Sequence, residues 1–215
     1  MKKSIYIFFG VIFGILYVDK RINAFTSCRK IKHNVLEGLQ IPSISFYNGV
    51  RREKNNNTLT QRVENTTFYF QDRNCIVLNV PQLYGDENTK SQILEYEMFA
   101  PVFSQLNIDA IYCSSPHDCF TQQSWGQTIR LKEKNEPQKS VFHNIMFIPD
   151  TKRHFATFLG FQSQKYDLEN FRASLFIQNN TIQKVFIDYP DDNVFLTLNQ
   201  TRANNMLLFL SNFFG

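Results

Sequence analysis

From Thr66 onward the chain alternates short apolar runs with longer segments in which apolar residues recur with helical spacing. Short runs rich in β-branched and aromatic residues predict strands, and a nearly continuous apolar run predicts a strand buried on both faces. The predicted strands are 67–70, 74–80, 108–114, 141–148, 171–177 and 182–188. This order of elements predicts a single α/β domain.

Apolar residues spaced three to four positions apart predict the helices of this domain. They are expected at 88–105, from Asp118 onward, at 153–159 and at 201–213. Pro81 ends the strand before the first helix, and Pro101 is expected to kink or shorten the last turns of that helix. Asp118 is a candidate N-cap and Gly160 a candidate C-terminal cap. The pair Asn179-Asn180 predicts a tight hairpin.

The N-terminus has the pattern of a targeting segment. Met1 to Lys3 is charged, and the apolar run from Ile5 to Val18 has the length of a secretory signal rather than of a comfortable membrane span. Residues 1–24 are therefore interpreted as a signal peptide cleaved near Ala24 or, because no clean small-x-small site follows the run, as an uncleaved signal anchor. Either alternative brings the chain into a secretory route, and no other membrane contact is expected.

Residues 25–40 form a possible transit or linker segment before a domain at 41–215. The stretch from Cys28 to Asn34 is basic and free of acids, which is typical of a second-stage transit peptide but equally of a solvated basic stub. Asn- and Lys-rich stretches such as Arg51 to Thr60 resemble the biased proteins of apicomplexan parasites, whose plastid import uses a two-part leader. The apicoplast is therefore a hypothesis for the compartment.

The distribution of charge argues against nucleic-acid binding. The net charge of +4 owes much to the leader and to Arg51–Lys54, and no basic stripe interleaved with aromatic residues follows, so no nucleic-acid partner is expected. The insertion at about 48–63 is polar and is expected to be a mobile loop.

The cysteines and histidines show no metal-binding pattern. The four cysteines, at 28, 75, 113 and 119, have neither CxxC nor zinc-site spacing, which argues against a structural metal and against a disulfide framework. His117, His143 and His154 are scattered over different predicted elements and are interpreted as surface or capping residues. No cofactor is expected.

Several segments keep both the residue types and the spacing of one protein family. These are 108–114, 117–120, 125–126, 147–150, 155–160 and 171–175. From about Ile41 to the C-terminus the chain resembles the type-five branch of the peroxiredoxins, including the bacterial form fused to glutaredoxin. The resemblance implies a thioredoxin-like fold with a central mixed β-sheet flanked by helices. It also implies an antioxidant thiol peroxidase that takes electrons from glutathione or glutaredoxin, and a homodimer.

The family's catalytic motif is Pro-x-x-x-Thr-x-x-Cys, which places a thiolate in the first turn of the helix after the central strand. Helix amides and a nearby arginine lower the pKa of that thiol and hold the peroxide oxygens. Here Pro81 matches the proline, Gly85 stands in place of the threonine and Asn88 in place of the cysteine. The reacting sulfur is therefore missing from its family position.

The residues around Asn88 suit a helix start better than a thiolate. Asp86 and Glu87 would raise the pKa of a neighbouring thiol, whereas acids and Asn favour the N-terminal end of a helix. Arg172 aligns with the family's arginine. It is interpreted either as part of a retained anion or peroxide pocket, or as the partner of Asp86, Glu87 or another acid in an ion pair.

Cys119 is the one alternative thiol with a physical case, because a helix start can lower the pKa of a cysteine, although Asp118 opposes that effect. Two functional hypotheses follow. The first is a degenerate, non-catalytic redoxin that serves as a binding, scaffold or chaperone-like protein in a secretory-derived compartment. The second is an active peroxidase for hydrogen peroxide and alkyl hydroperoxides, coupled to glutathione or glutaredoxin, with a relocated nucleophile.

Overall fold

The computed structural model describes residues 36–52, 59–132, 144–160, 172–188 and 200–215, all within the unit Lys32–Gly215. The predicted leader and most of the predicted transit segment lie outside the described residues, as do His143 and the predicted start of the strand at 141. Those interpretations stay predictions. None of the helices in the described ranges is long and apolar enough to cross a membrane.

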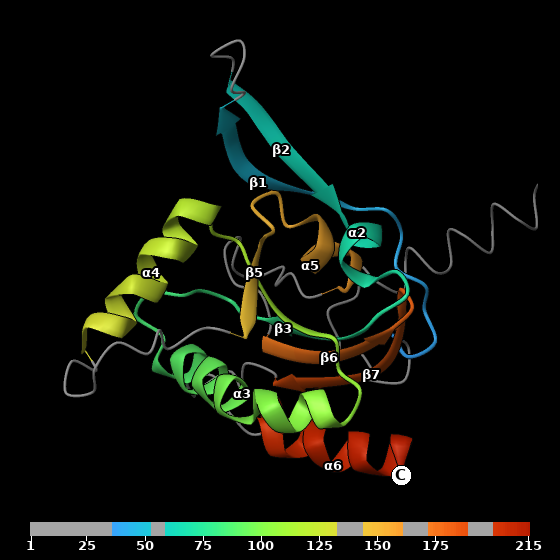
Figure 1. Cartoon of the computed structure of the whole chain (residues 1–215). Helices are drawn as coiled ribbons and strands as arrows, with labels where there is room; N and C mark the ends of the chain where they lie inside the picture. Colours follow the sequence, from blue (N-terminus) through green and yellow to red (C-terminus); the bar gives the residue numbers. More distant parts are fainter. Residues whose placement is uncertain (1–35, 53–58, 133–143, 161–171, 189–199) are drawn as a thin grey trace, which may run out of the picture. The chain divides into compact units, whose positions relative to one another are not determined.

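A five-stranded mixed sheet forms the centre of the domain, in the order β5-β4-β3-β6-β7 (Figure 1). The parallel part joins β3 to β4 and β4 to β5, while β6 runs antiparallel to β3 and β7 antiparallel to β6. The strands are β3 (Asn74–Asn79), β4 (Ala110–Ser115), β5 (Ile145–Pro149), β6 (Arg172–Gln178) and β7 (Thr181–Asp188). The predicted α/β class with a mixed sheet is confirmed.

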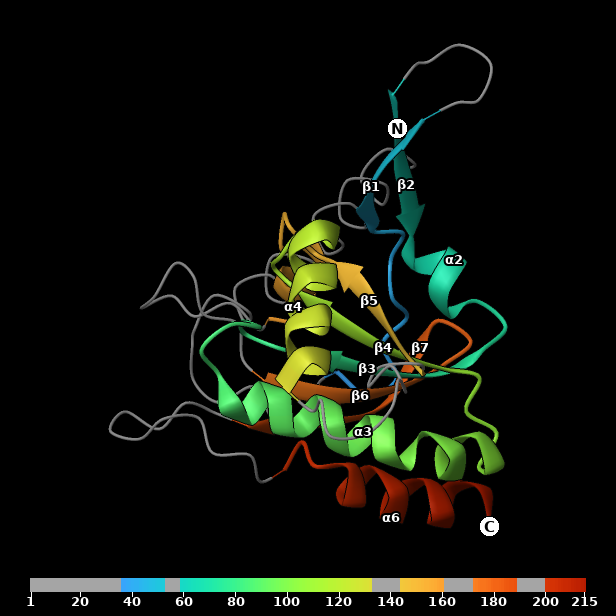
Figure 2. The same cartoon turned by 60° about the vertical axis from the view of Figure 1, so that its left-hand side comes forward.

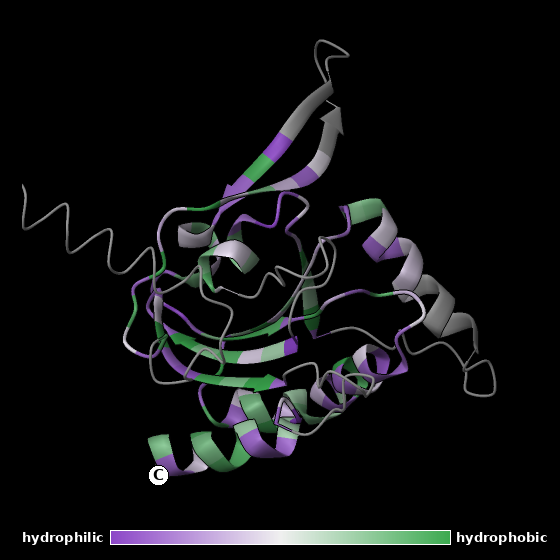
Figure 3. Ribbon diagram, turned by 180° about the vertical axis from the view of Figure 1, so that it is seen from behind, coloured by the Kyte–Doolittle hydropathy of each residue, from purple (hydrophilic) through white to green (hydrophobic). Residues whose placement is uncertain are grey.

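The central strands β3 and β4 are buried along almost their whole length because both faces of the sheet are covered, and their middle residues are mainly apolar. All six residues of β4 are buried, as are five of the six in β3, and these strands carry the hydrophobic colours of Figure 3. Figures 1 and 2 show α3 (Glu87–Gln105) and α6 (Ala203–Phe214) lying together on one side of the sheet. An extended apolar cluster lies between these two helices and the strands, and includes Ile93, Phe103, Phe176 and Met206.

The remaining helices are α2 (Thr66–Phe70), α4 (Cys119–Lys132) and α5 (His154–Phe158). The prediction of a strand at 67–70 was wrong, because Asn65 begins a helix there: its side-chain oxygen accepts a hydrogen bond from the Phe68 amide at 2.9 Å. Pro101 lies inside α3, which continues to Gln105, so the expected shortening does not occur.

The insertion at 48–63 was expected to be a mobile loop, but its described parts belong to an antiparallel hairpin. The hairpin consists of β1 (Ser45–Arg52) and β2 (Leu59–Asn65). Phe46 is fully buried at the base of the hairpin and packs edge-on against Tyr69 and Phe155, with ring centroids 5.7 and 6.0 Å apart. The described parts of the insertion are therefore paired as strands in a hairpin whose base packs on the body of the domain through Phe46.

Two predicted turns are confirmed. Asn179 and Asn180 join β6 to β7 with φ angles of 45° and 61°, as a tight hairpin requires. Gly160 follows α5 with φ of 71°, which fits the C-terminal cap expected of it.

Candidate functional site

The segment from Pro81 to Asp86 connects the end of β3 to α3 and contains the positions of the family motif. Pro81 is buried directly after the strand, and Gly85 is exposed with φ of 75°. A threonine is strained at such a left-handed backbone angle, because its branched Cβ clashes with the chain. A threonine at this predicted motif position would therefore meet a backbone conformation that disfavours it.

Asp86 is the N-cap of α3, and the helix begins at Glu87. Asp86 Oδ1 accepts hydrogen bonds from the amides of Asn88 at 3.0 Å and Thr89 at 3.2 Å, and its Oδ2 accepts one from Thr89 Oγ1 at 2.6 Å. Helix capping in this segment was predicted, but the cap is the aspartate rather than Asn88. Asn88 lies in the first turn, where the family places its thiolate, and it is partly buried.

Arg172, at the start of β6, reaches the same helix terminus. Its side chain is fully buried, and its Nη2 donates to Asp86 Oδ2 at 2.6 Å. Glu87 is exposed. Of the two interpretations of Arg172, the ion pair with Asp86 is the one found. The sheet brings these residues together, because β6 pairs with β3 and α3 follows β3 directly.

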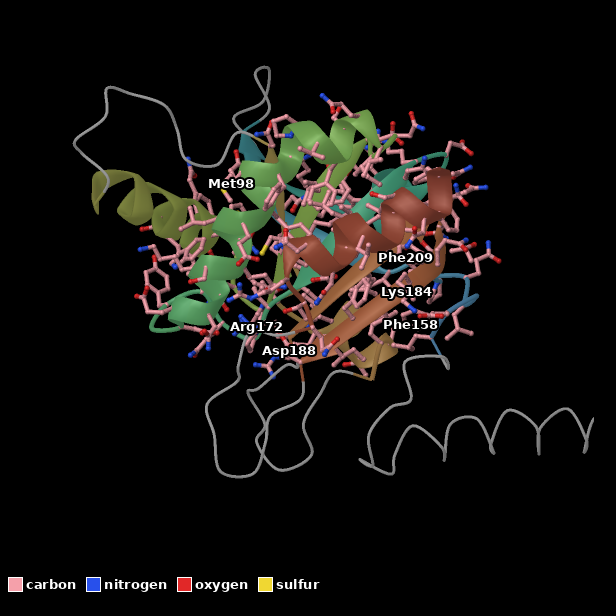
Figure 4. The ribbon with its side chains drawn as sticks, turned by 90° about the horizontal axis from the view of Figure 1, so that it is seen from below. Met98, Phe158, Arg172, Lys184, Asp188 and Phe209 are labelled. Carbon is pink, nitrogen blue, oxygen red and sulfur yellow. The ribbon has the colours of Figure 1, made fainter. Side chains whose placement is uncertain are left out.

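Further polar side chains continue inward from Arg172. Arg172 lies opposite Asp188 in the β6–β7 ladder, and Figure 4 shows the two residues close together. Gln92 Nε2 donates to Ser174 Oγ at 3.2 Å and to the Thr201 carbonyl at 3.3 Å. Sequence reasoning missed this buried polar group, because Gln92 and Thr201 are 109 positions apart and belong to no recognisable motif.

Two of the described cysteines are buried, and burial disfavours their reactive thiolate form. Cys75 is fully buried in β3, and burial raises the pKa of its thiol to about 12. Cys113 is fully buried in β4, and burial likewise raises its pKa. Because the thiolate is the reactive form, neither residue suits attack on a peroxide near neutral pH.

Cys119 is partly exposed and is the first residue of α4. The carboxylate of Asp118 caps this helix, accepting from the Thr121 amide at 2.9 Å and from Thr121 Oγ1 at 3.1 Å. The sulfur lies against the backbone of Gly49, since a Cβ added to that glycine would come within 2.8 Å of it. Cys119 therefore has a negative neighbour and a covering strand, and no arginine contact is present among the described residues.

His117, which lies just before α4, contacts the loop that precedes α3. Its Nε2 accepts a hydrogen bond from the Leu83 amide at 3.4 Å, and its ring meets the Tyr84 ring edge-on at 6.4 Å between centroids. Burial lowers the pKa of His117, which favours the neutral ring that this contact needs. The sequence predicted a surface or capping histidine, and no sequence signal links it to the loop at 81–86. Across the ranges that the structure describes, no cluster of ligands suitable for a metal ion is found.

Comparison with known proteins gives a consistent sequence relationship. The chain is 27% identical over 157 residues to a hybrid peroxiredoxin of Haemophilus influenzae, a match that covers 71% of this chain and 58% of that protein, less than two thirds of its length. It is 26% identical over 153 residues to a peroxiredoxin of Rhizobium etli, covering 68% of this chain and 79% of that one. No protein-family model matches the chain.

Solved structures of peroxiredoxins share the fold. The antioxidant protein of Plasmodium falciparum, a 1-Cys peroxiredoxin, superimposes with a TM-score of 0.64 over 82% of this chain and 99% of that chain at 18% identity. Peroxiredoxin 5 of Alvinella pompejana gives a TM-score of 0.59 over 82% and 97% at 19% identity. The predicted resemblance and the predicted thioredoxin-like fold are thereby confirmed.

Proposed function

We propose that this peroxiredoxin-like redoxin protein does not turn over peroxide and acts instead as a non-catalytic binding or scaffold protein. The observation that carries the proposal is Asn88 in the first turn of α3, at the position of the family's nucleophile. A carboxamide does not ionise to a nucleophile near neutral pH, so it cannot form the sulfenic acid on which thiol peroxidase turnover depends.

The other residues of the site support the same conclusion. Arg172, which in the family activates thiolate and peroxide, is engaged by Asp86. Cys75 and Cys113 are buried with raised pKa values. The domain does not need a cysteine at position 88 in order to fold, because the apolar cluster under α3 and α6 does not include that residue.

An active peroxidase with a relocated nucleophile is the second candidate, and Cys119 is the observation that favours it. Its sulfur belongs to a partly exposed residue at the start of a fourteen-residue helix. Glutathione or glutaredoxin would be the reductant of such an enzyme. The Asp118 carboxylate and the absence of a described arginine at Cys119 make this candidate weaker than the non-catalytic one.

The compartment and the assembly form the remainder of the proposal. The signal-like segment at 1–24 and the basic stretch after it support entry into the secretory route, with the apicoplast as the specific compartment. A homodimer is proposed from the resemblance to type-five peroxiredoxins. Imaging of a tagged full-length chain and light scattering of the purified domain would test these two points.

Hydrogen-peroxide consumption by the purified protein, with glutathione and glutaredoxin present, tests the proposed activity. The wild type and Cys119→Ser are compared with an active peroxiredoxin as positive control. We expect both proteins to consume peroxide at the rate of the reductant system alone. Turnover by the wild type that disappears in Cys119→Ser would establish the relocated peroxidase and overturn the proposal.

A further inference from the structure

The carboxylate of Asp86 occupies a set of donors that resembles a binding site for a small anion. Four hydrogen bonds converge on its two oxygens, from the Asn88 amide, the Thr89 amide, Thr89 Oγ1 and Arg172 Nη2, at distances between 2.6 and 3.2 Å. Two backbone amides, a hydroxyl and a guanidinium are the groups that commonly hold a free carboxylate or phosphate.

Arg172 supplies the independent evidence that this is a site and not only a cap. A helix cap needs no arginine, yet this guanidinium is fully buried against it, and its Nε and Nη1 have no hydrogen-bond partner among the described residues. A buried cation requires a compensating anion, because removing its charge from water is costly. Asp86, with only 13% of its side chain exposed, provides that anion.

We infer that Arg172 and the first turn of α3 form a preformed oxyanion site whose ligand in this chain is its own Asp86 side chain. Asp86 thus closes the site to anions and peroxides from solution. The inference deepens the proposed function, on which it rests, because self-occupation is a second barrier to peroxide chemistry beside the missing thiol. Once Asp86 is shortened, the site is expected to take formate, the smallest free carboxylate.

Chemical rescue by formate tests this inference. The variants are Asp86→Ala, which removes the carboxylate, and Glu87→Gln, which removes the same charge one residue away on an exposed side chain. The thermal midpoint of each protein is measured in sodium formate and in sodium chloride of equal ionic strength. Formate at about ten times its Kd is expected to raise the midpoint of Asp86→Ala by about 3 to 6 °C relative to chloride.

Wild type and Glu87→Gln are expected to show no difference between the two salts. A response to formate in the wild type equal to that of Asp86→Ala would overturn the inference, because the site would then be open. Equal midpoints of Asp86→Ala in formate and chloride would also overturn it.

Two further variants keep the test decisive if Asp86→Ala does not fold. Asp86→Ser retains a capping oxygen without the charge and should show the same formate effect. Asp86→Ser combined with Arg172→Met should lose it, because the guanidinium is gone and no charge is left unpaired. If formate still stabilises the double variant as it does Asp86→Ser, the binding lies elsewhere and the inference fails.

The formate result is separable from the proposed function. Peroxide consumption by the wild type through Cys119 would overturn the proposed function and leave formate rescue of Asp86→Ala intact. If formate fails to rescue Asp86→Ala and the wild type shows no peroxidase activity, only the inference is overturned.

Discussion

Two neighbouring strand-to-helix connections at the same edge of the sheet divide between them the chemistry that a thiol peroxidase needs in one place. After β3, the start of α3 carries Asp86, which pairs with the buried Arg172 of β6, and it has Asn88 in place of a thiol. After β4, the start of α4 carries Cys119 and an aspartate cap, and no described arginine hydrogen-bonds to Cys119 or to Asp118. At this edge of the sheet the buried arginine therefore lies at a helix start without a thiol, and the thiol of Cys119 lies at the other helix start.

The comparison shows that a carboxylate can take up the N-terminal amides of a helix that would otherwise be available to a cysteine. Both helices carry an aspartate whose side chain accepts amide hydrogen bonds of the first turn. In each case the positive end of the helix is thus already satisfied by a carboxylate. Among the described residues, what distinguishes the two sites is the buried guanidinium of Arg172, which reaches the connection after β3 because β6 pairs with β3 and not with β4.

The largest expected effect concerns the exposure of the thiols. Alkylation by iodoacetamide, followed site by site by mass spectrometry, is expected to label Cys119 at least about 10³-fold faster than Cys75 or Cys113. Those two react only when the sheet opens, against a free energy of about 5 kcal/mol or more. Equal rates for Cys119 and Cys75 would remove the contrast between the two helix starts, and Cys119→Ser serves as the control for assignment.

The ion pair after β3 is expected to dominate the stability of its helix start. Arg172→Met leaves Asp86 with a largely buried, unpaired charge and should lower the free energy of unfolding in urea by about 3 to 5 kcal/mol. Arg202→Met is the matched control, since Arg202 pairs with Glu95 near the surface at 3.4 Å and should cost less than about 1 kcal/mol. Similar losses in the two variants would show that the buried pair has no special role.

Restoring the motif threonine sharpens the comparison in the loop. Gly85→Thr forces a β-branched residue to φ of 75° and should lower the free energy of unfolding by about 1 to 3 kcal/mol. Nothing lies within 4 Å of a Cβ at this position, so the cost is one of backbone strain and not of crowding. Gly85→Asn, which tolerates a left-handed backbone, should cost clearly less; an equal cost would refute the strain argument.

The smallest expected effect lies at the cap of α4. Asp118→Ala should cost about 1 kcal/mol at pH 7, because the first-turn amide of Thr121 loses its acceptor. Hydrogen bonds from Thr121 hold the pKa of Asp118 below its ordinary value of 3.8.

A depressed carboxyl pKa gives a stabilisation that is present above 3.8 and is lost as the pH falls through the lower folded value. The difference between wild type and Asp118→Ala in urea unfolding should therefore shrink below about pH 4. A difference that persists unchanged at pH 2 would exclude the carboxylate as its source.

The sequence predicted the sheet because strand burial leaves a local signal. The strands Asn74–Asn79 and Ala110–Ser115 each contain a run of mainly apolar residues. The turn at Asn179 and Asn180 is predicted by the two asparagines themselves, which tolerate positive φ angles. The prediction failed at Thr66–Phe70, where the local N-cap at Asn65 was overlooked, and at the polar insertion, whose described parts pair in a hairpin with Phe46 packed at its base.

At the site, the sequence alone shows that position 88 is an asparagine and not a cysteine, because the identity of a residue does not depend on the fold. The same holds for the candidate ion pair of Arg172, since a buried arginine demands an acid and two acids stand near the helix start. The tertiary structure alone decided that Asp86, 86 positions away, is the partner, that Cys119 lies against Gly49, and that His117 contacts Leu83. Those choices depend on which strands pair and where each helix begins, and strand pairing is set by the packing of the whole sheet rather than by neighbours along the chain.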